Sequence, residues 1–256
     1  MLSLDSSYFN DLFDDPAQQE PADIHLDVPF VPTDEAMVEA MLKLAEVGRR
    51  DVLYDLGSGD GRIVVEAALQ RHIRSVGIEL DPLRVAEAME YAALSRVEHL
   101  VDFIEDDIFT AEIGEATIVT LYLLQSVNVK LRSKLLSELR PGTRVISHAF
   151  DMGDWQADER RELSGTRLYK WIIPAQVAGQ WEWEGLDGTP YHLELTQRYQ
   201  MVKGRVWEGD DERDLKRATL TGNTLRIELQ GSTTTSRKRF TLIFEDKELD
   251  TIYDTT

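Results

Sequence analysis

A short glycine-rich segment, Asp55-Leu-Gly-Ser-Gly-Asp-Gly61, is the part of the sequence best suited to holding a ligand. The apolar run of residues 52–56 leads into it, and a helical pattern of residues follows. Glycine tolerates a positive φ and lets the backbone lie close against a ligand. A strand followed by a turn and a helix would place Gly57, Gly59 and Gly61 at the carboxyl edge of a parallel sheet, where such sheets bind their ligands.

The spacing of these glycines discriminates between ligands. A dinucleotide-binding fingerprint has two residues between its second and third glycines, whereas here only Asp60 intervenes. Asp55 stands just before the loop, where a carboxylate repels phosphate and suits a cationic amino-acid group. The Gly-Lys-Ser/Thr ending of a phosphate-binding P-loop is also missing. The pattern therefore favours a ligand that carries an ammonium group and no phosphate.

Acidic residues also end the next two expected strands. Glu79 closes the run of residues 75–79, where an acid can accept hydrogen bonds from both ribose hydroxyls. Asp107 follows the run of residues 101–105 and can accept from an adenine amino group while Ile108 packs on the ring. An ammonium group, a ribose and an adenine without phosphate describe S-adenosylmethionine, which we predict as the cofactor.

Alternating strand and helix patterns must position these residues. Thr33 is expected to cap a first helix, Asp81 a helix that begins at Pro82, and Asn128 a helix that runs to Leu139. The expected parallel strands are residues 51–56, 75–79, 101–105, 117–123 and 144–149, and residues 161–163 and 167–173 are expected to pair antiparallel. This order predicts a Rossmann-like α/β fold, a seven-stranded mostly parallel sheet with helices on both faces.

The rest of the chain has a different character. Residues 176–256 show short alternating segments and no convincing helix, which predicts a C-terminal antiparallel β-rich domain, a small barrel or sandwich. The segments are residues 177–183, 191–199, 201–207, 224–229 and 237–244. Residues 1–27 form an acidic N-terminal arm, which leaves residues 28–175 as the cofactor-binding domain.

Composition narrows the choice of partners. The 256 residues include 47 acidic and 28 basic side chains, a net charge of −19, which disfavours nucleic acid and favours basic partners. The chain has no cysteine, and its histidines lack metal-ligand spacing, so we expect no disulfide, no thiolate nucleophile and no metal site. It has neither a signal-peptide pattern nor a long apolar run, so we expect a cytoplasmic protein without a membrane partner.

Several segments resemble the class I, seven-β-strand methyltransferases. They are more similar to a subgroup of protein lysine methyltransferases that includes archaeal broad-specificity enzymes and mitochondrial enzymes acting on the adenine nucleotide translocase and the ATP synthase c-subunit. The matching segments are residues 28–33, 54–63, 77–81, 116–123 and 142–148. The resemblance implies that Phe30, Pro32 and Thr33 lie over the methionine end of the cofactor, and it agrees with the positions assigned to Asp55, Glu79, Asp107 and Ile108.

The resemblance implies methyl transfer to a lysine amine in a basic protein substrate. Class I enzymes place the acceptor at the end of the fourth strand, which makes Tyr122 the best candidate to position or deprotonate an amine, with a core-packed tyrosine as the equal alternative. His148 is expected to be a structural histidine or a general base. Two other functions stay open: methylation of a small molecule such as an amine, with the β region as a lid or dimer contact, and a non-catalytic S-adenosylmethionine-binding interaction protein.

Overall fold

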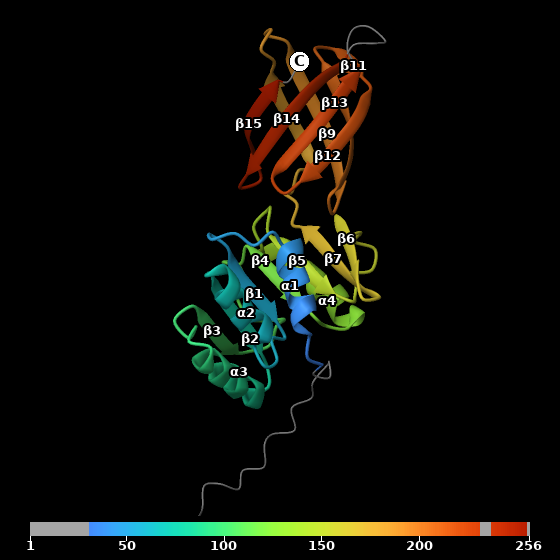
Figure 1. Ribbon diagram of the computed structural model, residues 1–256. Coiled ribbons are helices and arrows are strands. Elements are labelled where there is room, and N and C mark those ends of the chain that lie inside the picture. The colour runs from blue at the N-terminus through green and yellow to red at the C-terminus, as the bar shows by residue number, and fades with distance from the viewer. Residues whose placement is uncertain (1–30, 231–236, 255–256) are drawn as a thin grey trace, which may run out of the picture.

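The computed structural model describes residues 31–230 and 237–254. A seven-stranded sheet with the order β3-β2-β1-β4-β5-β7-β6 forms the first part of the chain (Figure 1). Its strands are β1 (Val52–Leu56), β2 (Arg74–Glu79), β3 (Val101–Glu105), β4 (Ile118–Leu121), β5 (Arg144–His148), β6 (Glu159–Leu163) and β7 (Thr166–Ile172). The first five strands are parallel and β7 pairs antiparallel with β5 and β6, which confirms the predicted mostly parallel sheet.

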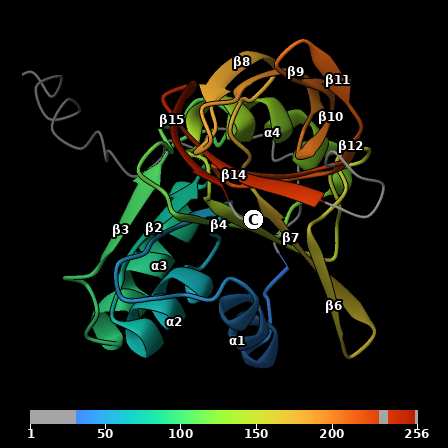
Figure 2. The same cartoon turned by 90° about the horizontal axis from the view of Figure 1, so that it is seen from above.

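Helices cover both faces of this sheet (Figure 2). They are α1 (Glu35–Leu44), α2 (Arg62–Arg71), α3 (Pro82–Leu94) and α4 (Gln125–Glu138). Alternation along β1 sends Leu53 into a core shared with α1 and α2, and Tyr54 and Leu56 into a core shared with α4. Burial on both faces explains why the parallel strands are almost entirely apolar in sequence.

Two of the three predicted helix caps are wrong. Asp34, not Thr33, caps α1, because its carboxylate accepts a hydrogen bond from the Met37 amide at 2.9 Å, and this charge also suits the positive end of the helix. Helix α4 begins at Gln125, so Asn128 is an interior residue that donates to Ser147 Oγ at 3.1 Å. Asp81 caps α3 as predicted, accepting from the Leu83 amide at 2.9 Å.

The C-terminal part forms two four-stranded antiparallel sheets, ordered β11-β10-β9-β8 and β12-β13-β14-β15. The strands are β8 (Gly179–Glu184), β9 (Pro190–Arg198), β10 (Met201–Glu208), β11 (Asp211–Arg213), β12 (Leu215–Thr221), β13 (Thr224–Gln230), β14 (Arg237–Glu245) and β15 (Glu248–Asp254). The two sheets share one core, in which Trp183 stacks on Tyr191 and meets Phe240 edge-on. The predicted β-rich architecture is confirmed, although the sequence patterns missed β11, β12 and β15.

The C-terminal sheets adjoin the amino edge of the parallel strands (Figure 1). The Ala175 amide donates to the Gly222 carbonyl at 2.8 Å, and a side chain at Gly222 would meet the backbone of Gly142, just before β5, at 3.1 Å. The Trp155 indole donates to Gln200 at 2.9 Å in the same region. Within one chain these sheets therefore do not cover the carboxyl edge, which contradicts the lid expected under the small-molecule hypothesis.

Candidate active site

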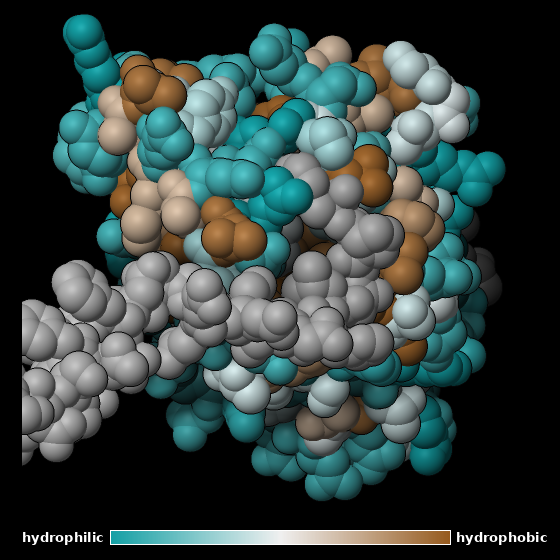
Figure 3. Space-filling model, turned by 90° about the horizontal axis from the view of Figure 1, so that it is seen from below, coloured by the Kyte–Doolittle hydropathy of each residue, from teal (hydrophilic) through white to brown (hydrophobic). Residues whose placement is uncertain are grey.

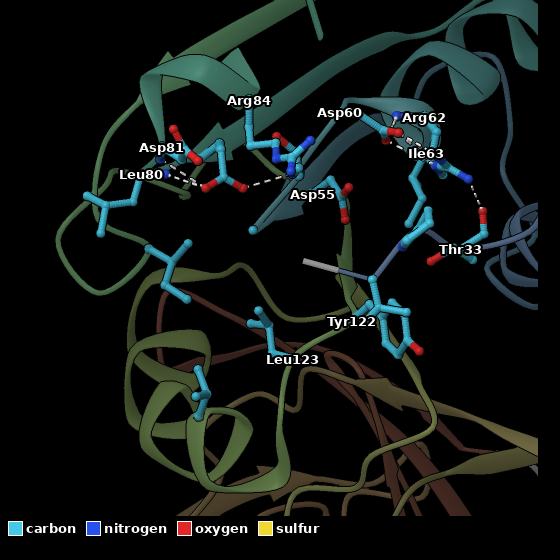
Figure 4. A pocket seen from close by; sticks show the side chains of 18 of the residues that line it. Thr33, Asp55, Asp60, Arg62, Ile63, Leu80, Asp81, Arg84, Tyr122 and Leu123 are labelled. Atoms are coloured by element: carbon cyan, nitrogen blue, oxygen red, sulfur yellow. Dashed lines mark hydrogen bonds and ion pairs between the residues drawn. The ribbon is translucent and has the colours of Figure 1, made fainter. Parts of the chain in front are cut away.

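A cavity of about 620 Å³ opens at the carboxyl ends of β1, β2 and β4 (Figure 4). It brings together nine of the residues selected from the sequence: Pro32, Thr33, Asp55, Gly57, Gly59, Glu79, Asp107, Ile108 and Tyr122. Of the other two selected residues, Phe30 lies outside the described residues, and Gly61 lies in the loop as the residue before α2.

No helix in the described ranges is both long and apolar enough to cross a bilayer.

The glycine loop adopts a backbone that other residues rarely adopt. Gly57, Gly59 and Gly61 have φ values of 78°, 53° and 76°. A Cβ at Gly57 would come within 2.9 Å of Leu123, and one at Gly61 within 2.6 Å of Phe103. Gly57 therefore keeps the floor of the cavity open, whereas Gly61 permits close packing of the loop against β3.

Asp55 lies at the base of the cavity and is 2% exposed. Burial raises the pKa of this carboxyl group to about 7; a hydrogen bond from Thr120 Oγ1 at 2.6 Å opposes the rise, and the negative charges of Glu79 and Asp60 add to it. Without a ligand the group is thus close to half-protonated at neutral pH. A cation bound above it would hold it in the ionised form, which fits the ammonium group of S-adenosylmethionine.

Glu79 does more than the sequence indicated. Its Oε2 accepts a hydrogen bond from the Gly59 amide at 2.8 Å, while Oε1 accepts from the amides of Leu80 at 2.9 Å and Asp81 at 3.0 Å. These bonds tie the end of β2 to the glycine loop and fix the carboxylate. A carboxylate offers about four acceptor sites, so one more hydrogen bond, such as that from a ribose hydroxyl, can still be accepted.

Asp107 and Ile108 lie on the same cavity wall, in the turn that follows β3. One carboxylate oxygen of Asp107 accepts from the Phe109 amide at 2.8 Å, which fixes the side chain. Its second oxygen has no hydrogen-bond partner in the part of the chain that the structure describes. That oxygen can take an amino group of adenine while the apolar Ile108 side chain contacts the ring.

Arg62 is a site residue that the sequence reasoning missed. Its guanidinium donates to the Thr33 carbonyl at 2.7 Å and to the Asp60 carboxylate at 3.0 Å, so it joins the segment before α1 to the glycine loop. All three residues line the cavity. The sequence offered one signal for this role: Arg62 stands two positions after Asp60, and such an acid–arginine pair can stiffen a ligand-binding loop.

Tyr122, the sequence-predicted acceptor residue, lies directly after β4. The tyrosine is half-buried and lines the cavity, so it is not confined to the core. Its ring lies 3.9 Å from the ring of His148, the last residue of β5. Across the described residues, no group of three or more histidine or acidic side chains is arranged to hold a metal ion.

Several known methyltransferases are similar to this chain. A family model described as the ANTKMT methyltransferase domain matches residues 55–159. A protein-lysine N-methyltransferase of Saccharolobus islandicus is 42% identical over 52% of this chain and 83% of its own length. The mouse adenine nucleotide translocase lysine N-methyltransferase is 37% identical over 52% of this chain, which spans only 58% of the mouse protein.

A solved structure is also similar. It is described as an RNA methyltransferase from Salinibacter ruber in complex with S-adenosyl-L-homocysteine, the product that remains when the cofactor has lost its methyl group. It is 53% identical, with a TM-score of 0.57, and the match covers 57% of this chain and 96% of that one. Because it has this cavity and matches these relatives over most of their length, the chain belongs to the family of the protein-lysine N-methyltransferases, within the class I S-adenosylmethionine-dependent methyltransferases.

Proposed function

We propose that this enzyme transfers methyl groups from S-adenosylmethionine to a lysine amine of a basic protein. One observation carries the proposal: a cavity with an acid at its base and acids on its wall opens beside Tyr122 in a chain that matches most of a protein-lysine N-methyltransferase. The cavity supplies the cofactor site, and the relatives support lysine as the acceptor.

The chain's own residues would bind the cofactor, orient the reacting groups and exclude water from them. When bound, the cofactor supplies a methyl group activated by a positively charged sulfur. Asp55 would hold the cationic amino-acid end of the cofactor, Glu79 the ribose and Asp107 the adenine, and Tyr122 lines the same cavity. Holding amine and methyl group in line converts a bimolecular encounter into an oriented reaction, the main contribution such an enzyme makes.

The acceptor lysine must lose a proton from its nitrogen before it can attack the methyl group. A lysine has a reference pKa of about 10.4, and burial beside a cation lowers that value. The net charge of −19 attracts basic proteins over long distances. Seen from the end opposite the C-terminal sheets, the described surface is mainly hydrophilic with scattered apolar residues, which suits a polar, charged substrate (Figure 3).

RNA is the second candidate acceptor, because the Salinibacter ruber relative at 53% identity is described as an RNA methyltransferase. The net charge and the absence of an Asn-Pro-Pro-Tyr segment after β4 favour protein over RNA. Methylation of a small amine and a non-catalytic binding role are further alternatives.

Incubation with cofactor labelled on its methyl group and a lysate separates these possibilities. Label in a protease-sensitive, RNase-resistant band supports the proposal, and amino-acid analysis must then find methyl-lysine. Label released by RNase supports the RNA alternative, label only in small solutes supports a small-molecule substrate, and no label despite cofactor binding supports a binding role. Gly59→Arg, which places a large side chain in the cofactor loop, is the matched inactive control.

A further inference from the structure

Three elements meet at the side of the cavity that Tyr122 lines. Tyr122 follows β4, His148 ends β5, and Asp34 caps α1. The Tyr122 and His148 rings lie 3.9 Å apart at an interplanar angle of 32°, and the negative charge of Asp34 acts to raise the pKa of His148 against the effect of burial. Figure 4 shows Tyr122 and Thr33 on one side of the cavity and Leu80 and Asp81 on the other.

His148 has hydrogen-bonding capacity that the described residues do not satisfy. The residue is 7% exposed, and its Nδ1 is buried without a hydrogen-bond partner among the residues that the structure describes. Leaving a buried polar atom unpaired costs about 1–3 kcal/mol. Because such atoms are rare in native proteins, this one indicates a partner that the described residues do not supply.

The backbone beside His148 is held in a strained conformation. Ala149, which is not a glycine, has a φ of 68°. Its amide donates to the Arg167 carbonyl at 2.8 Å, and the buried Asn128 amide donates to the Phe150 carbonyl at 3.2 Å. Strain of this kind persists where neighbouring bonds enforce it, and it concentrates at functional sites. The turn therefore fixes the backbone that carries His148.

The surroundings keep this imidazole uncharged at neutral pH. Burial lowers the pKa of His148, while Asp34 of the α1 cap opposes that effect. On β7, Leu168 is in register with His148, and the nearby Lys170 pairs with Glu46 at 2.6 Å. Asp151 in the following turn accepts from Gln125 of α4. A neutral imidazole can accept a proton from an arriving ammonium group.

We propose that Asp34, Tyr122 and His148 form the subsite for the acceptor amine, in which Asp34 attracts the ammonium, Tyr122 packs against its methylene stem and His148 takes its proton. The inference rests on the proposed lysine methyltransferase function and assigns its acceptor site. In this subsite the neutral ring carries its hydrogen on Nε2, so the lone pair of Nδ1 is free.

The step balances as follows. One proton passes from the ammonium nitrogen to Nδ1, which gives a neutral amine and an imidazolium. The amine lone pair then forms the nitrogen–carbon bond to the methyl group as the carbon–sulfur bond breaks, and S-adenosylhomocysteine leaves. The imidazolium returns its proton to water before the next turnover.

Three substitutions distinguish the contribution of the aromatic ring of His148 from that of its nitrogen atoms. His148→Phe keeps an aromatic ring beside Tyr122 and removes the unpaired Nδ1, so we expect unchanged or higher stability and an unchanged cofactor Kd. We expect kcat on the labelled protein substrate to fall at least tenfold and the low-pH limb of kcat/KM to disappear. His148→Gln and His148→Ala, which likewise cannot take up the proton, should be no faster than His148→Phe.

Asp34→Asn tests whether the charge of Asp34 attracts the substrate ammonium group. Asparagine caps helices as well as aspartate does, so α1 should stay folded. We expect the KM for the protein substrate to rise several-fold with little change in kcat or cofactor affinity. An unchanged KM would remove Asp34 from the subsite.

A binding measurement tests the subsite without catalysis. We would titrate n-butylamine into ring-labelled protein saturated with S-adenosylhomocysteine and follow the five histidine side chains by NMR, with n-butanol as the control. His148→Phe identifies the His148 resonance. A saturable shift of that resonance with the amine and none with the alcohol supports the subsite.

Either of two results would overturn the inference: an His148→Phe enzyme with wild-type kcat and pH profile, or an amine titration that leaves the His148 resonance unmoved. If the wild type methylates no protein in the lysate, the proposed function fails by itself. The amine titration then still decides whether the subsite binds an alkyl ammonium.

Discussion

At the scale of single residues, Asp55 links cofactor binding to pH. Burial raises the pKa of Asp55 from 3.8 to about 7. At pH values between these two, Asp55 is protonated in the folded protein without cofactor and ionised in the unfolded chain. Stability without cofactor should therefore fall as pH rises from about 4 to 7 and level off above 7, by a total on the order of 4 kcal/mol.

The cofactor should reverse this trend. A cationic ligand favours ionised Asp55, so affinity for S-adenosylmethionine should rise with pH up to about 7 and then level off. Calorimetry between pH 5.5 and 8.5 measures this dependence. Asp55→Asn should be more stable than the wild type without cofactor, by more at pH 8 than at pH 5, and should bind cofactor more weakly without the pH dependence attributed to Asp55. A less stable Asp55→Asn protein at pH 8 would contradict the assignment of a buried, costly charge.

Glu79 holds both a loop and, by our assignment, a ribose. Glu79→Gln removes the charge and replaces one acceptor oxygen with a donor group, which then faces backbone amides. We expect the cofactor Kd to rise by one to two orders of magnitude, because hydrogen bonds to a charged group contribute about 1.5–3 kcal/mol. Isothermal titration measures the effect, and hydrogen exchange of the Gly59 amide should increase in parallel. A normal Kd would exclude the ribose assignment.

At the scale of elements, the methyltransferase half was largely predictable from the sequence. Its apolar runs mark strands buried on both faces. The glycine loop and the acids at the carboxyl ends of β1, β2 and β3 meet in one cavity, because these ends of parallel strands share an edge. Asn128 was assigned wrongly because a cap and a buried helix interior amide look alike in sequence; only the tertiary contact with Ser147 distinguishes them.

The C-terminal sheets were predicted only in part. Strands β12 and β15 read as Leu-Lys-Arg-Ala-Thr-Leu-Thr and Glu-Leu-Asp-Thr-Ile-Tyr-Asp, which carry too few apolar residues for a clear alternating pattern. Partners across the sheet stabilise them, since β13 pairs with β12 and β14 with β15. Long-range contacts of this kind are not visible in a local pattern.

An arginine pair on α2 allows a matched test of how elements are joined at the cavity. Arg62 donates hydrogen bonds to the Thr33 carbonyl and to Asp60. Arg71, on the last turn of the same helix, does not line the cavity and forms an ion pair with Glu39 of α1 at 3.0 Å. Arg62→Gln should raise the cofactor Kd about tenfold by releasing the segment before α1. Arg71→Gln should leave that Kd unchanged and cost at most about 1 kcal/mol of stability. Equal effects of the two substitutions on binding would show that Arg62 acts only through helix stability.

At the scale of the whole molecule, cofactor binding should be independent of the C-terminal sheets. All lining residues of the cavity fall between Val31 and Val127, and the C-terminal sheets contact the other edge of the parallel strands. A fragment of residues 28–175 should bind S-adenosylmethionine with a Kd within about threefold of the full chain, although exposure of Trp155 should lower its melting temperature. A fragment that has native circular dichroism and fails to bind would refute this independence. The same experiment tests the predicted boundary at residue 175.

The separation of the cavity from the C-terminal sheets sets a size requirement on any partner that touches both. A parallel strand of five residues alone spans about 16 Å, so a short peptide seated over the cavity cannot also reach the far sheets. A partner held at both ends must be a folded or extended body of comparable length. Two-point attachment would select a lysine by its distance from a remote anchor, and neighbouring residues in the target would be free to vary.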